Sequence, residues 1–158
     1  MKKESVMQKL FTYAGNYKYL TIASWILSAT SALIALLPFY YIWRIMQEVV
    51  LAAPDYSKAN LSGLGWSAVG FALLSMIIYI CALLCSHIAA FHVQANMRST
   101  LMRHILTLPM GFMDSEGSGK IRKIVNESTA ATETYLAHQM PDKAGAMATP
   151  VGLLVLLV

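Results

Sequence analysis

Charged residues are scarce in this chain, and the scarcity is concentrated in two stretches. Only 13% of the 158 residues are Asp, Glu, Lys or Arg, whereas about a quarter is usual in soluble domains. No charged residue occurs between Lys18 and Arg44, or between Lys58 and Arg98. Each interval exceeds the roughly 20 residues that a helix needs to cross a bilayer. The composition therefore excludes an ordinary soluble domain and predicts an integral membrane protein.

The two uncharged runs also lack the alternation of polar and apolar residues that marks the strands of a membrane barrel. Because lipid offers no hydrogen-bond partner to the backbone, helices are the remaining way to cross. We therefore expect an all-α fold of several transmembrane helices. The expected segments are an amphipathic elbow helix (1–18), a first transmembrane helix (19–43), an extracellular loop (44–62), a second transmembrane helix with a cytosolic extension (63–108), an intracellular loop (109–127), and a cytosolic helix that leads into a third transmembrane helix (128–158).

Prolines are few, and two of them set predicted helix boundaries. Pro38 should kink the first span, because proline removes a backbone donor. The next helix meets no proline between Leu64 and Pro109. At 1.5 Å per residue, about 45 residues reach roughly 65 Å, twice the hydrocarbon thickness. This helix should therefore protrude into the cytosol. The third span is expected to begin near Ala144 and to be interrupted at the last residue.

Basic residues lie at the ends of the apolar runs instead of forming a patch interleaved with aromatic residues, which argues against nucleic acid as a partner. The segment before the first span has four lysines and one glutamate, whereas the loop after it balances two basic and two acidic residues. By the positive-inside rule, we expect the N-terminus to be cytosolic. The expected location is the plasma membrane, which the chain would cross more than once.

Cysteine is rare, and residue patterns for catalysis are missing. Cys81 and Cys85 lie one turn apart inside the second span and could supply only two ligands to a metal ion. The histidines do not form the pairs of a histidine-box enzyme, and no serine lies on a G-x-S-x-G elbow. The glycine-rich run ending at Lys120 lacks the first glycine and the final hydroxyl residue of a phosphate loop. No catalytic, cofactor-binding or metal-binding residue is therefore predicted.

The motif Leu108-Pro109-Met110-Gly111-Phe112-Met113-Asp114, followed by Ser118-Gly119-Lys120-Ile121, resembles a signature of type I ATP-binding cassette (ABC) exporters. In that family the first part closes a long intracellular extension, and the second begins the first coupling helix. The resemblance covers nearly the whole chain. The chain resembles the N-terminal part of a bacterial half transporter and would contain spans one to three of six.

The resemblance implies a mechanical role in an ATP-driven transporter. The coupling helix would contact a nucleotide-binding domain through eight residues: Gly119, Lys120, Ile121, Arg122, Lys123, Ile124, Val125 and Asn126. Implied partners are the lipid bilayer, the nucleotide-binding domain, a second half transporter and an unknown substrate. This chain contains no Walker motif, so ATP and Mg²⁺ are implied only for the full-length transporter. The alternatives are a small membrane anchor or regulatory protein that acts through its cytosolic helices, and a histidine-metal membrane enzyme.

Overall fold

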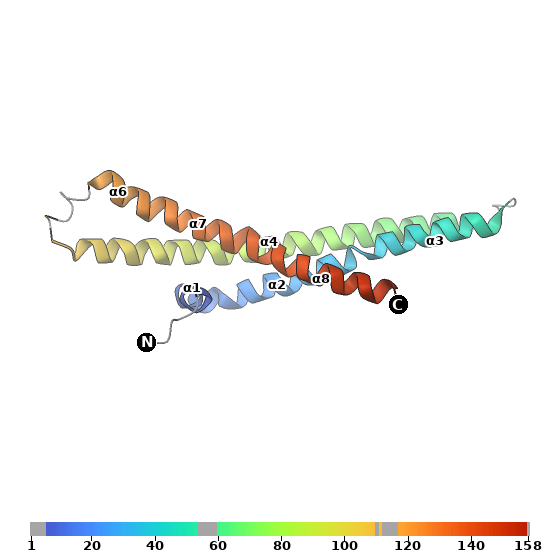
Figure 1. The fold of residues 1–158 in the computed structure, drawn as a ribbon, viewed down its shortest axis with the longest axis horizontal. Coiled ribbons are helices and arrows are strands. Elements are labelled where there is room, and N and C mark those ends of the chain that lie inside the picture. Colours follow the sequence, from blue (N-terminus) through green and yellow to red (C-terminus); the bar gives the residue numbers. More distant parts are fainter. Residues whose placement is uncertain (1–5, 54–59, 110, 112–116, 158) are drawn as a thin grey trace. The chain divides into compact units, whose positions relative to one another are not determined.

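The computed structural model describes residues 6–53, 60–109, 111 and 117–157. Every secondary-structure element in these residues is helical (Figure 1), which confirms the predicted all-α fold. Two helical stretches, Gln8–Ala52 and Leu61–Leu106, are long and apolar enough to cross a membrane. By contact the chain divides into two compact units, Met1–Ser24 with Leu83–Met140 and Trp25–Ala82 with Pro141–Val158.

The elbow segment consists of α1 (Val6–Ala14) and a short 3-10 turn, η1 (Gly15–Tyr17). Gly15 has a φ of 54°, a conformation that glycine adopts without strain. In the first unit, Leu10 and Ala14 pack against Ala90 and Val93 of α4 (Leu61–Leu106). The apolar face of the elbow segment therefore packs against α4 within the same unit.

The first apolar run forms two helices, α2 (Lys18–Ile34) and α3 (Leu37–Ala52). The interruption precedes Pro38, which occupies the first turn of α3 and cannot donate to the carbonyl four residues before it. The structure thus confirms the kink expected at this proline. The segment expected to be loop from residue 44 is helical as far as Ala52. The centre of that loop, 54–59, lies outside the described residues.

The second apolar run forms α4, a single helix of 46 residues. A straight helix of that length measures about 70 Å, so the residues expected to extend beyond the hydrocarbon are helical as predicted. Thr107 and Leu108 bond back to His104 and Ile105 in a tightened last turn, just before Pro109. In the second unit α3 and the first part of α4 lie side by side (Figure 1), with the rings of Tyr41 and Phe71 stacked 5.5 Å apart.

The return segment is one run of helical turns with two wider π-helical stretches. It comprises α6 (Ser118–Lys123), η3 (Ile124–Ser128), α7 (Thr129–Thr134), η4 (Tyr135–Gln139) and α8 (Met140–Leu157). The second π-stretch ends two residues before Pro141, whose ring would clash with the carbonyl of Ala137 in a regular α-helix. The wider turn relieves that clash.

Candidate functional site

The segment predicted to contact a nucleotide-binding domain, called the motor domain below, occupies α6 and the first turn of η3. Gly117 precedes it with φ 73° and ψ 140°, a conformation that is strained for any residue with a side chain. A glycine here lets the chain turn directly into the helix. Residues 112–116, which precede this glycine, lie outside the described residues.

Burial divides the eight predicted contact residues into two groups. Val125 is 7% exposed and Ile121 is half-buried, so these two pack within the chain. Ile124 is 47% exposed although it is apolar. The exposed members are Gly119, Lys120, Arg122, Lys123, Ile124 and Asn126. The exposed surface of this segment therefore combines three cationic side chains with one exposed isoleucine.

A pocket of about 390 Å³ lies on the inward side of α6. Its lining joins this helix to the lower part of α4 and consists of Arg98, Met102, Ser118, Ile121, Arg122, Val125 and Asn126. Ile121 faces this pocket, whereas Ile124 is absent from its lining. Of the two isoleucines, Ile124 is thus the one available to a partner.

Thr129 ties this segment to α4 in the first unit. The side chain is fully buried, and its hydroxyl donates to the carbonyl of Val125 at 2.6 Å while accepting from Nε of Arg98 at 3.0 Å. A charge-assisted bond of this kind is stronger than a bond between neutral groups. The ion pair between Lys123 and Glu127, 3.8 Å apart and largely exposed, adds little.

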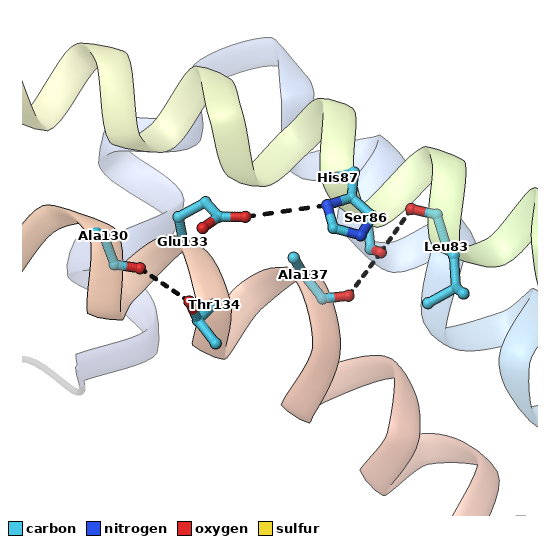
Figure 2. Close-up of polar contacts among 7 residues, drawn as sticks. All are labelled: Leu83, Ser86, His87, Ala130, Glu133, Thr134 and Ala137. Carbon is cyan, nitrogen blue, oxygen red and sulfur yellow. Dashed lines mark hydrogen bonds and ion pairs between the residues drawn. The ribbon is translucent and has the colours of Figure 1, made fainter.

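Figure 2 shows a second link between α4 and the return segment, again within the first unit. The hydroxyl of Ser86 lies 2.8 Å from the carbonyl oxygens of both Ala137 and Leu83. The usual helical donor to Ala137 would be the N–H of residue 141, which is a proline. Ser86 therefore supplies the hydrogen bond that Pro141 cannot.

Two histidines that look isolated in the sequence are neighbours in the structure. The rings of His87 and His138 lie 4.8 Å apart in an edge-to-face arrangement. Nδ1 of His87 is 3.9 Å from Oε1 of Glu133, toward which it points in Figure 2. Sequence spacing did not predict this cluster, because its members belong to helices about 50 residues apart. A weak signal was available, since Glu133 and His138 are polar residues just before the third apolar run.

The structure also shows where the residues considered as metal ligands lie. Cys81 is exposed and Cys85 is half-buried, and both are free thiols. In the described part of the chain, no group of three or more His, Cys, Asp or Glu residues is arranged to hold a metal ion. His92 instead stacks on the ring of Tyr17 at 3.6 Å.

Four small hydroxyl residues on α2 are buried, and the sequence analysis did not single them out. They are Thr21, Ser24, Ser28 and Ser31. Their spacing of three or four residues puts them on one helix face, which was the signal that could have revealed them. Small polar residues on one face let membrane helices pack closely and bond to neighbouring backbones.

Residues 18–158 match the family described as ABC transporter transmembrane region. The match covers most of the chain, which therefore belongs to this family and is part of the membrane domain of an ABC transporter.

Three curated relatives share sequence with the chain. The mycobactin import ATP-binding/permease protein IrtA of Mycobacterium tuberculosis is 29% identical over 136 residues, which cover 86% of this chain and 16% of the relative. The protein of the same name from Mycolicibacterium smegmatis is 26% identical over 136 residues, again 86% of this chain and 16% of the relative. That from Mycolicibacterium thermoresistibile is 27% identical over the same share of this chain and 15% of its own length. The chain thus spans about one sixth of the length of these proteins.

Proposed function

We propose that the chain couples ATP hydrolysis on a nucleotide-binding domain to the movement of a substrate across the plasma membrane. The observation that carries the proposal is the family match over residues 18–158, joined to an exposed helix at the end of a long helical extension. The relatives' names combine ATP binding with a permease, which supports a motor domain as partner. The match favours this function over a small membrane anchor.

The proposed contact surface is the exposed part of the predicted coupling segment, 119–126. Ile124 would insert into the motor domain, and the cationic side chains around it would contact acidic or polar groups. Val125 and Ile121, which pack within the chain, would instead transmit movement to α4. The links through Thr129 and Ser86 would keep the segment from moving independently of α4.

The orientation proposed with this function has a cytosolic N-terminus, because the lysines before the first span outnumber its single glutamate. The coupling segment then lies on the same side as the N-terminus, after two crossings. A second half transporter would complete the translocation path. ATP and Mg²⁺ would bind to the motor domain.

Replacing Ile124 by Asp in the complete gene product tests the coupling surface. Burying a side chain of this size contributes about 1.5–3 kcal/mol, so losing the contact should weaken coupling at least tenfold. The protein is reconstituted in vesicles with every native cysteine, including Cys81 and Cys85, replaced by Ser and a single cysteine placed at Val50, which is 75% exposed. ATPase activity and the effect of ATP on maleimide labelling of that cysteine are then measured.

We expect ATP to change the labelling rate in the parent and to have no effect in Ile124→Asp, which keeps its ATPase activity. Ala131→Asp is the matched control, because Ala131 is exposed on α7 outside the coupling segment, and it should behave as the parent. An unaltered ATP response in Ile124→Asp would refute the coupling assignment. A complete gene product without ATPase activity would refute the proposed function itself.

A further inference from the structure

The pocket of about 390 Å³ between α6 and the lower part of α4 has a buried floor and an exposed rim. Val125 is 7% exposed and Ile121 is half-buried, whereas Met102, Arg122 and Asn126 are exposed. Every residue of its lining belongs to the first unit. The volume falls within the roughly 300–1,000 Å³ that is usual for small-molecule sites. The pocket is therefore large enough for a small ligand and open to it.

The floor of the pocket is apolar. Val125, Ile121 and Met102 line it with aliphatic or thioether side chains, and the stem of an arginine is also apolar up to its guanidinium group. Small-molecule sites combine such a lining with a few polar groups that fix the orientation of the ligand. The part of a ligand that enters this pocket should therefore be hydrophobic.

Two arginines give the pocket its charge. Arg98 comes from α4 and Arg122 from α6, so they line it from two different helices. Residues 118–126 contain three basic residues and no acidic one, and Arg122 is the one of these three that lines the pocket. Like charges beside one cavity repel each other, and a bound anion would relieve that repulsion. The polar end of a ligand should therefore be negatively charged.

The guanidinium group of Arg98 is held in place before any ligand binds. Its Nε donates to the hydroxyl of Thr129 at 3.0 Å, and Thr129 is fully buried. A guanidinium group has five N–H donors, and this bond uses the one on Nε. A planar guanidinium group binds a carboxylate through two parallel hydrogen bonds. Fixing the donor in advance lowers the entropy that binding costs.

We propose that this pocket binds an amphiphilic carboxylate, whose apolar body lies against Val125 and Ile121 and whose carboxylate group lies between Arg98 and Arg122. Such a ligand would bridge α4 and the coupling segment. The inference goes beyond the proposed function, because binding requires neither ATP nor the movement of a substrate. A negative result would therefore leave the coupling role proposed for Ile124 untouched.

The test is calorimetric titration of the complete gene product in micelles of an uncharged detergent, without nucleotide. The heat measured with empty micelles is subtracted. The probes are phenylbutyrate, neutral phenylbutanol, which keeps the apolar body, and acetate, which keeps only the carboxylate group.

Two pairs of variants separate the pocket from its surroundings. Arg122→Gln is the main variant, and Lys123→Gln is its matched control, because Lys123 loses the same charge at the next position but is absent from the lining. Both residues are exposed, so neither change should disturb the fold. Ile121→Ala and Ile124→Ala form the second pair, since Ile121 lines the pocket and Ile124 does not.

We expect phenylbutyrate to bind the parent and Lys123→Gln equally, and to bind Arg122→Gln about tenfold more weakly, because a charge-assisted hydrogen bond is lost. Ile121→Ala should weaken binding severalfold, and Ile124→Ala should not change it. Phenylbutanol and acetate should each bind the parent about tenfold more weakly than phenylbutyrate, because each lacks one half of the match.

Equal affinity for phenylbutyrate and phenylbutanol, or unchanged phenylbutyrate binding in Arg122→Gln, would overturn the proposal. So would equal losses in Arg122→Gln and Lys123→Gln, which would indicate attraction by the general positive charge of the segment. Acetate binding as tightly as phenylbutyrate would also overturn it, since the site would then accept a bare anion.

Discussion

Replacing Ser86 by Ala removes the hydrogen bond that links α4 to the carbonyl of Ala137. Ser86 is 1% exposed and Ala137 is 0% exposed, so water cannot replace the lost donor. The bond is 2.8 Å long. An unsatisfied buried acceptor costs about 1–3 kcal/mol, while hydrogen bonds measured between membrane helices average about 0.6 kcal/mol and reach about 1.7 kcal/mol. We expect Ser86→Ala to lower the free energy of unfolding by about 1–2 kcal/mol.

A double-mutant cycle separates this bond from simple packing. Pro141→Ala restores an N–H four residues after Ala137, so the carbonyl regains its helical donor and no longer depends on Ser86. The cost of Ser86→Ala should therefore fall to near zero when Pro141 is also Ala, which corresponds to a coupling energy of about 1 kcal/mol.

The assay is unfolding of the complete gene product in mixed micelles by a titration with sodium dodecyl sulfate, followed by circular dichroism. Ser99→Ala, at an exposed position of the same helix, is the control and should leave the midpoint unchanged. Ser86→Ala could instead lower the free energy of unfolding equally in the parent and in Pro141→Ala. That result would show that the Ser86 hydroxyl does not replace the missing donor. The reasoning about Pro141 would then be refuted.

Two further predictions concern glycines. A Cβ atom at Gly152 would lie 2.6 Å from Cδ1 of Leu36 and 2.7 Å from Cδ2 of Leu33, so Gly152→Val should cost about 1–3 kcal/mol through overpacking. The same unfolding titration measures this cost, with Gly70→Val as the control because nothing lies within 4 Å of a Cβ there. Gly117→Ala should cost about 1–3 kcal/mol in backbone strain at φ 73°. Faster hydrogen exchange of the α6 amides would reveal it, and unchanged exchange would contradict the role given to this glycine.

Much of the helical architecture was predictable because it depends on local chemistry. The gaps between Lys18 and Arg44 and between Lys58 and Arg98 predicted helices, since an uncharged segment in lipid must satisfy its own backbone. The break before Pro38 followed from the missing donor of proline. The motif around Pro109 indicated the family that the comparison with known proteins established.

The candidate sites were less predictable, because they depend on how helices pair. The sequence places Ile121 and Ile124 alike in the coupling segment, yet only packing against α4 leaves Ile124 exposed and turns Ile121 toward a pocket. His87 gains Glu133 and His138 as neighbours only through the pairing of distant helices. The position of Pro141 four residues after Ala137 was a local clue that a donor would be needed from elsewhere.

The sequence by itself determined that the chain is helical, that it enters a membrane, and which family it belongs to. These properties follow from hydrophobicity, from the hydrogen-bonding needs of the backbone and from a short motif. Only the tertiary structure decided that the hydroxyl of Tyr79 donates to Asp142 and that the hydroxyl of Ser86 donates to the carbonyl of Ala137. Such contacts depend on the register between antiparallel helices, where a shift of a single residue turns each side chain by about 100° around its axis.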